Sequence, residues 1–313
     1  MSSEERKLDD AARAAWLAYT GGCKQDEIAQ IMGISRQSAQ RLVSQALAAG
    51  LVKVRIDHPI ARCMDLARQL RERYGLALCE VVPSLDSFAS SGLAVSQATG
   101  NLLERYLTQP EPLVIGLGTG RVLRAAVEHL PHLDCAQHKI VSLTGNISPD
   151  GSTAFYNVLF TIADKITAQT YPVPLPVITA SAEERAALLG QKTLDVTRAL
   201  VERADIRLVG VGTMIEAAPL VIDGFITQAD QRRLREKGAV GEIVGFVFDA
   251  EGRLIEDEIN SRVSSASLSR DHPGPTIAAA HGPDKVPAIR GALIGRLANG
   301  LVTDEDTAAA LLA

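Results

Sequence analysis

Aromatic residues are scarce in this chain: Phe, Tyr and Trp make up 4% of its 313 residues, and there is one tryptophan. Membrane-length apolar runs are also lacking, and the N-terminus, SSEERKLDD, is charged where a secretory signal would be apolar. The four cysteines form no CxxC pair, which favours reduced thiols over a disulfide framework or a standard zinc site. We therefore expect a cytoplasmic protein with no membrane span.

An excess of basic charge is lacking as well. The formal net charge is −5, which argues against a protein that coats nucleic acid along its whole length. It leaves open a DNA-reading protein whose positive charge is confined to one small face. A length of 313 residues can bury two hydrophobic cores, so we expect two domains.

The segment 23–50, CKQDEIAQIMGISRQSAQRLVSQALAAG, predicts a helix, a tight turn and a second helix. Asp26 and Glu27 suit the positive end of the first helix. Gly33 falls where the chain must turn, and Ser35 is a good N-cap for the second helix. The residues of the second helix that we expect to face inward are Ala39, Leu42, Val43, Ala46 and Leu47.

The outward side chains at the start of this second helix have the chemistry of a DNA-reading helix. Arginine pairs with guanine edges, glutamine with adenine, and serine or arginine with phosphates. A helix-turn-helix places this part of its second helix in the major groove, whereas the alternative is an ordinary helical hairpin with a polar face. The candidate DNA contacts are Ser35, Arg36, Gln37, Ser38, Gln40 and Arg41.

The segments on either side complete a small N-terminal domain. An amphipathic helix over 4–20 is expected to pack Leu8, Ala12, Trp16 and Tyr19 on the helix-turn-helix, and the alternation in 51–56 predicts a short wing strand. A helix over 60–74 follows. The expected division is a DNA-binding domain over 1–58, a linker helix over 59–75 and an effector domain over 76–313.

Beyond residue 75, strand-like and helical patterns alternate, which predicts an α/β domain with a mainly parallel sheet covered by helices. The expected strands are 76–82, 113–117, 139–143, 177–180, 206–211, 243–248, 276–280 and a strand around 301–302. The expected helices are 92–106, 122–129, 154–168, 183–189, 193–203, 228–237 and 286–297.

Residues 113–120, LVIGLGTG, run as a strand into a glycine-rich turn before a helix. Glycines let the backbone close on an anion, and Thr119 adds a hydroxyl donor. A dinucleotide site would need an acid about 20 residues on, but the next strand closes on Thr144. A bound sugar or phosphate, a purely structural turn and a nucleotide cofactor remain open, in that order of preference, and we expect no cofactor.

Other expected strand ends carry polar groups. Thr213 lies in a second glycine-threonine turn, Glu242 precedes an apolar strand, and Lys285 begins a helix. Carboxylates suit sugar hydroxyls, while a lysine suits a phosphate as a point charge. A metal site is not expected at the evenly spaced His129, His132, Cys135 and His138, because the spacing fits no standard ligand pattern.

The chain resembles the SorC family of transcriptional regulators over nearly its whole length. The likeness rests on QDEIAQIMGISRQSAQRLVSQALAAGLVKVRI, on VGEIVGFVFDAEG and on DKVPAIRGALIGRLANGLVTDEDTAAALL. The resemblance implies an effector domain similar to sugar-phosphate isomerases and a dimer or tetramer that responds to sugars, polyols or their phosphates. The family's phosphate loop falls on Gly116, Gly118, Thr119 and Gly120, its acidic sugar contact on Glu242 and its late lysine on Lys285.

This sequence departs from the family pattern at three places. Arg121 replaces a hydroxyl residue, His281-Gly282 replaces Gly-Gly, and the segment near SLTGN carries Asn146 and no basic residue. The ligand is then an unphosphorylated polyol, or Arg121 takes over the anion. Arg121, Asn146 and Thr213 complete the candidate effector site.

The resulting hypothesis is a cytoplasmic, homo-oligomeric regulator of a carbohydrate or polyol operon. It binds operator DNA through successive major-groove half-sites and is controlled by a sugar, polyol or sugar phosphate. The alternative is a sugar-phosphate isomerase-like enzyme that carries an accessory DNA-binding module. We expect no enzymatic activity, because nothing in the strand-end residues requires turnover.

Overall fold

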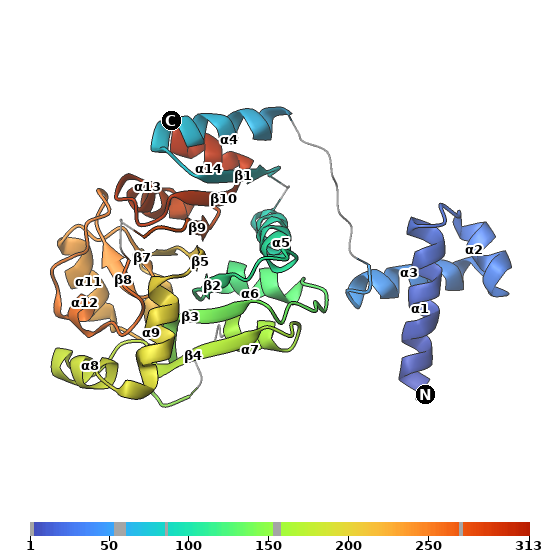
Figure 1. The fold of residues 1–313 in the computed structure, drawn as a ribbon. Helices are drawn as coiled ribbons and strands as arrows, with labels where there is room; N and C mark the ends of the chain where they lie inside the picture. The colour runs from blue at the N-terminus through green and yellow to red at the C-terminus, as the bar shows by residue number, and fades with distance from the viewer. Residues whose placement is uncertain (1–2, 53–60, 85–86, 153–157, 269–271) are drawn as a thin grey trace. The chain divides into compact units, whose positions relative to one another are not determined.

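The computed structural model describes residues 3–52, 61–84, 87–152, 158–268 and 272–313 (Figure 1). The chain forms two compact units, Met1–His58 and Pro59–Ala313. The expected linker helix is α4 (Ala61–Tyr74), which packs on β1 and α14 within the larger unit. The four cysteines are free thiols, as expected.

The smaller unit contains α1 (Ser3–Tyr19), α2 (Gln25–Met32) and α3 (Arg36–Ala48). Gly33 ends α2 with a left-handed φ of 65°, which glycine adopts without a side-chain penalty. Ser35 caps α3, because its side chain accepts a hydrogen bond of 3.1 Å from the Ser38 N–H. The predicted helix-turn-helix is therefore present, with its turn and cap at the expected residues.

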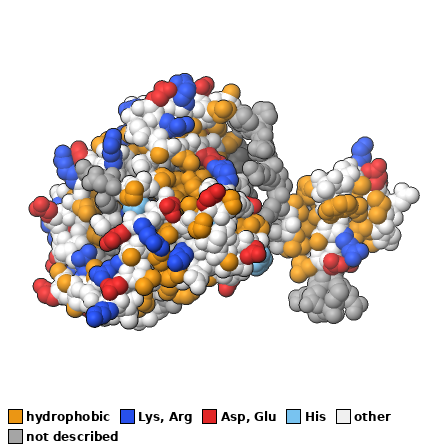
Figure 2. All heavy atoms as spheres, viewed as in Figure 1, with side chains coloured by type: hydrophobic (Ala, Val, Ile, Leu, Met, Phe, Trp, Pro, Cys, Tyr) orange, Lys and Arg blue, Asp and Glu red, His pale blue; other side chains and the backbone are white. Residues whose placement is uncertain are grey.

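The expected packing face of α1 was wrong. Leu8, Trp16 and Tyr19 are 41%, 61% and 52% exposed. The helix instead packs through its alanines, whose small side chains let it approach the other helices closely. Among the side chains of α1 that the structure describes, the buried ones are Ala11, Ala14 and Ala15. Figure 2 shows apolar side chains spread over the visible face of this unit.

Three further expectations concern the packing face of α3, the wing strand and the start of the next helix. Leu47, expected inward, is 44% exposed, because the buried stripe of α3 runs through Ala39 and Ala46. Leu51 and Val52 form no strand, and the rest of the predicted wing lies outside the described residues. Ile60, the first residue of the expected helix over 60–74, also lies outside them, whereas Cys63, Leu66 and Leu70 of that helix are buried.

The larger unit is built on a seven-stranded sheet in the order β1-β10-β9-β5-β2-β3-β4, in which every neighbouring pair is parallel. This confirms the predicted α/β class. The strands are β1 (Leu78–Val82), β2 (Val114–Leu117), β3 (Lys139–Ile147), β4 (Gln169–Pro176), β5 (Ile206–Gly210), β9 (Thr276–Ala279) and β10 (Gly300–Asp304).

Helices cover both faces of the sheet. On one face, α5 (Phe88–Leu107), α6 (Arg121–Glu128) and α7 (Val158–Ala163) share a buried cluster with alternate strand residues such as Ile206 and Leu208. On the other face lie α8 (Ala182–Leu189), α9 (Asp195–Glu202), α11 (Gln228–Glu236), α12 (Glu258–Arg262), α13 (Val286–Ile294) and α14 (Glu305–Leu312). Figure 1 shows α4 lying along α14 near β1.

Two expected strands were wrong. Residues 243–248 are a hairpin of β7 (Gly241–Ile243) and β8 (Phe246–Phe248), joined by Val244 and Gly245 at φ 46° and 90°. These strands form a small antiparallel sheet with β6 (Gly212–Thr213). Residues 177–180 form no strand, because β4 ends at Pro176. Three prolines hid β4 from the sequence pattern, and its place at the sheet edge explains why they are tolerated.

Candidate functional site

A cavity of about 240 Å³ lies at the carboxyl ends of β2 and β5. These neighbouring strands lie where the order of the sheet reverses, since β3 and β4 continue on one side and β9, β10 and β1 on the other. Open α/β sheets bind ligands at such a switch point. The walls come from the β2–α6 turn, the end of β5, the β7–β8 hairpin, the segment around α10 (Pro219–Ile222) and the residues after β9.

The β2–α6 turn brings backbone N–H groups to this cavity. Gly120 is the N-cap of α6, has a φ of 128° and has no side chain that could cap the helix. Gly210 allows close approach, because a Cβ there would lie 2.8 Å from the Thr119 carbonyl oxygen. Thr119, Gly120 and Arg121 all line the cavity. A helix N-terminus beside an arginine suits an anion.

Gly116 and Gly118 were expected in the effector site, but the structure places both outside the cavity lining. A Cβ on Gly116 would lie 2.8 Å from Leu143 Cδ2, so this glycine serves the packing of the core. Gly118 donates its N–H to the Leu208 carbonyl at 2.8 Å and extends the pairing with β5. Neither residue is among those that line the cavity.

Glu242 extends from β7 over Gly212, and the fit requires a glycine. A Cβ on Gly212 would lie 2.1 Å from Glu242 Oε1. The Gly245 N–H donates to Oε2 at 2.8 Å. Burial raises the pKa of Glu242, and this hydrogen bond and the charge of Lys285 oppose the rise. Val244 at φ 46° is a rare conformation for a β-branched residue, and strain of this kind gathers at binding sites.

Lys285 completes the basic side of the cavity, at the end of the short 3-10 helix Pro283–Lys285. Burial lowers the pKa of Lys285, the charge of Glu242 raises it, and Arg121 lowers it further. Across the cavity, burial raises the pKa of Asp223, which Arg121 opposes. The site therefore combines two cations with carboxylates that can accept hydrogen bonds from hydroxyl groups.

Several cavity residues were not among the predicted sites, because they follow no local motif. His281 is 5% exposed, and its Nδ1 lies 3.8 Å from Asp304 Oδ2. Burial lowers the pKa of His281, which Asp304 opposes. Thr144 and Phe225 also line the cavity, as does the expected Thr213. Asn146 does not line it, and its Oδ1 is buried without a hydrogen-bond partner.

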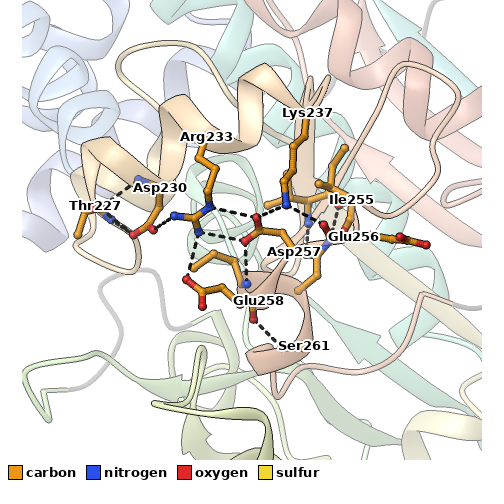
Figure 3. A network of polar contacts seen from close by, with 12 residues as sticks. Thr227, Asp230, Arg233, Lys237, Ile255, Glu256, Asp257, Glu258 and Ser261 are labelled. Atoms are coloured by element: carbon orange, nitrogen blue, oxygen red, sulfur yellow. Dashed lines mark hydrogen bonds and ion pairs between the residues drawn. The ribbon is translucent and has the colours of Figure 1, made fainter.

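A charged network ties α11 to the start of α12 (Figure 3). Arg233 donates from Nε and Nη2 to the two carboxylate oxygens of Asp257, both at 3.1 Å. Lys237 donates to Asp257 Oδ2 at 2.8 Å, and Arg233 also donates to Asp230 at 2.7 Å. The hydrogen bonds from Arg233 hold the pKa of Asp257 well below its usual range, with further help from Lys237.

The proposed DNA contacts stand on the exposed side of α3. Arg36, Gln37, Gln40 and Arg41 are exposed, whereas the Ser35 and Ser38 hydroxyls lie 2.9 Å apart at the helix cap. The Nε of Arg36 lies 3.4 Å from Asp26 Oδ1, and both side chains are about 70% exposed. Such a pair holds together weakly and can open when a phosphate or a base approaches.

Among the evenly spaced histidines, His138 serves the fold, whereas His132 is exposed. His138 is 1% exposed; the Leu113 N–H donates to its Nδ1 at 3.1 Å, and its Nε2 lies 3.1 Å from the Leu107 carbonyl oxygen. Within the described residues, no group of three His, Cys, Asp or Glu side chains could hold a metal ion. No described helix has both the length and the apolar character needed to cross a bilayer.

Comparison with known proteins finds two matching families and related regulators. Residues 58–313 match a family described as "Putative sugar-binding domain", and residues 14–59 match the MarR family. The erythritol catabolism regulatory protein EryD of Brucella abortus (strain 2308) is 35% identical over 302 residues, which cover 96% of each chain. The transcriptional regulator LsrR of Enterobacter sp. (strain 638) is 30% identical over 310 residues, 96% of this chain and 92% of that one.

A solved structure extends the likeness to the fold of the whole chain. The full-length sorbitol operon regulator SorC from Klebsiella pneumoniae matches with a TM-score of 0.75 at 24% sequence identity, over 100% of both chains. At this identity the match concerns the fold alone. Both units described above are therefore parts of one known architecture.

Proposed function

Because the chain belongs to the SorC family of DNA-binding transcriptional regulators, which control sugar-related operons, we propose that a small carbohydrate in the strand-end cavity controls its affinity for operator DNA. The observation that carries this proposal is the cavity at the switch point, where Glu242 and Lys285 meet with shifted pKa values. The matched relatives are named regulators, so the isomerase-like alternative is set aside.

The chemistry of the walls indicates a ligand with several hydroxyl groups. Glu242 and Asp223 accept hydrogen bonds from hydroxyls, while Lys285, Arg121 and the N-terminus of α6 receive a phosphate if the ligand carries one. The relative from Brucella abortus is named for erythritol catabolism, which places short polyols first among the ligands to test. Their phosphates come next, because Arg121 supplies an anion partner in place of the hydroxyl expected there.

The smaller unit reads DNA through α3. Arg36, Gln37 and Arg41 are exposed and adjacent on the first turns of this helix, where side chains reach base edges in the major groove. Self-association in the cytoplasm would place two such helices on successive half-sites. The exposed apolar stripe of Leu8 and Trp16 on α1 supports self-association, since such patches mark interaction surfaces.

Control by the ligand requires unequal affinity for two states of the protein. A ligand that binds one state about 100-fold more tightly shifts the equilibrium by about 2.7 kcal/mol, enough to change the occupancy of a promoter. The segment between Thr213 and α11 lines the cavity, and Thr227 at its end donates to Asp230, which accepts from Arg233 of the network. It is the element whose packing a bound ligand would change most directly.

A thermal-shift screen of sugars, polyols and their phosphates tests the proposal. A ligand at 100 times its dissociation constant stabilises the protein by about 2.7 kcal/mol, and Thr119→Ala and Lys285→Ala should remove most of that gain. The exposed Lys192→Ala is the matched control and should keep it. A screen without any stabilising compound, or one whose hit is unaffected by Lys285→Ala, would refute the assignment of this cavity.

A further inference from the structure

A second cavity, of about 380 Å³, lies on the α9 face of the sheet and shares no lining residue with the strand-end cavity. Its walls come from β4, α8, α9, the start of β5 and the segments 264–267 and 272–273. Val173, Leu189 and Leu194 make much of the lining apolar. Nothing in the proposed control by carbohydrate uses this space.

Arg207 is a buried cation in the wall of this second cavity. It is 5% exposed, and burial lowers its pKa to about 10. Its Nη2 donates to the Val201 carbonyl at 2.7 Å and its Nη1 to the Ser267 carbonyl at 3.4 Å, while its Nε has no hydrogen-bond partner. In the described part of the chain, no carboxylate forms an ion pair with it.

The burial of the Arg207 charge is energetically unfavourable when no ligand is bound. Buried charges in proteins are normally paired, because desolvation of an isolated ion is strongly unfavourable. Neutral carbonyl oxygens compensate part of that cost and leave the positive charge in place.

His272 adds a second buried nitrogen to the same wall. Its Nδ1 lies 3.1 Å from the Gly274 nitrogen and 3.0 Å from the Gly274 carbonyl oxygen, so either tautomer of the ring forms a hydrogen bond with Gly274. In the tautomer that accepts from the Gly274 N–H, the ring proton is on Nε2. That Nε2 is buried and has no hydrogen-bond partner. Arg185, Arg198 and Glu202 also line the cavity, and Arg198 is paired with Asp195. The lining therefore carries more positive than negative side chains, and two of its buried nitrogens, Arg207 Nε and His272 Nε2, have no hydrogen-bond partner.

We propose that this second cavity binds a small organic anion. Its carboxylate or phosphate group is received by Arg207 Nε and His272 Nε2, and its apolar part lies against Val173, Leu189 and Leu194. An arginine beside a second donor suits an oxyanion, and the apolar walls favour a ligand with a hydrocarbon portion over a bare ion. The Ser265 hydroxyl in this wall donates to Thr144 of the strand-end cavity at 3.1 Å, which places the two ligands in adjoining spaces.

Isothermal titration of the full chain with inorganic phosphate, acetate, hexanoate and hexyl phosphate tests the proposal. We expect hexanoate or hexyl phosphate to bind more tightly than acetate or phosphate, and the better of the two identifies the head group. Arg207→Gln and His272→Phe should each weaken binding about tenfold or more, as loss of a hydrogen bond to a charged group does. The exposed Arg203→Gln is the matched control and should bind as the wild type does.

Two further variants test whether the probes bind in the second cavity. Lys285→Ala should leave the binding of hexanoate unchanged, because Lys285 lines only the strand-end cavity. If Arg207→Gln does not fold, His272→Phe decides, since its ring lies in a loop. The proposal would be overturned if none of the four probes bound. It would also be overturned if a folded Arg207→Gln or His272→Phe variant bound the probe as tightly as the wild type does. A second copy that covers this wall in solution would also block every probe and overturn it.

Discussion

The two units of this protein use their charged and polar side chains in opposite ways. In the smaller unit, Arg36, Gln37 and Arg41 stand exposed on one helix. In the larger unit, Glu242 and Lys285 lie in a recess where burial shifts both pKa values. Contact with DNA needs side chains that protrude, whereas recognition of a small ligand needs groups already removed from water.

The hydrophobic cores of the two units also differ, in the size of the side chains that they bury. The smaller unit is held by alanines and a few aliphatic residues such as Ile28, and its two aromatic residues, Trp16 and Tyr19, are exposed. The larger unit buries whole strands and Phe248 at 0% exposure. Its stability should therefore respond far more strongly to truncation of a large side chain.

The largest expected effect follows from this contrast. Phe248→Ala should lower the free energy of unfolding of the larger unit by about 3–5 kcal/mol, because it removes a fully buried ring. Trp16→Ala, its counterpart in the smaller unit, should change stability by less than about 0.5 kcal/mol. Urea denaturation followed by circular dichroism measures both. Similar losses for the two variants would show that the contrast between the cores is wrong.

The network in Figure 3 should give the next largest effect. Asp257→Asn removes a carboxylate that is 2% exposed and paired with Arg233 and Lys237, and should destabilise the larger unit by about 1.5–3 kcal/mol at neutral pH. The ion pair of Asp9 and Arg13 in the smaller unit provides the matched control, because both side chains are at least half exposed. Asp9→Asn should have almost no effect.

The same network predicts a pH dependence with a definite sign. The pKa of Asp257 in the folded protein is lowered from 3.8, so its stabilising contribution is complete above pH 3.8 and is lost as pH falls through the folded-state value. The difference in unfolding free energy between wild type and Asp257→Asn should therefore shrink as pH falls below about 3.8. A difference that grows on acidification would contradict the assigned pairing.

DNA binding should respond to a change in the smaller unit that leaves stability intact. Gln37→Ala should weaken binding to the cognate operator by about 1–3 kcal/mol and relax specificity at one base pair, because a bidentate contact is lost. Gln45→Ala, near the other end of α3, is the matched control. Fluorescence anisotropy with operator variants measures both. Unchanged binding by Gln37→Ala across all operator variants would exclude this role.

The smallest expected effect concerns the exposed pair of Arg36 and Asp26. Asp26→Ala should change the stability of the smaller unit by less than about 1 kcal/mol, because both groups are about 70% exposed. It should also strengthen DNA binding slightly, since Arg36 no longer has to leave a partner. Weaker DNA binding by this variant would show that the pair positions Arg36.

The sequence predicted the smaller unit's turn and cap because these depend on local residues, Gly33 and Ser35. It did not predict which side of α1 packs, because the alanine stripe and the stripe through Trp16 both have helical spacing. That choice is made by the helices against which α1 packs. A turn or a helix cap can be predicted from the residues of one segment, whereas the packing face of a helix depends on the elements around it.

The larger unit shows the same limit at its sites. The turn after β2 was predicted, and Gly120 lines the cavity, but Gly116 serves the core. The contribution of Gly212 could not be predicted, because it depends on the carboxylate of Glu242 from another strand. The strand β4 was missed because its prolines are tolerated only at an edge, and edge position is a property of the assembled sheet.

The most direct test of the connection between the two units is operator affinity with and without the ligand found by the thermal-shift screen. A saturating ligand should change the dissociation constant of wild-type protein for its operator by at least about tenfold, which is about 1.4 kcal/mol. Lys285→Ala should bind the operator as tightly as ligand-free wild type and show no such change. Equal affinity of the wild type with and without a ligand that occupies the strand-end cavity would contradict control of DNA binding from that cavity.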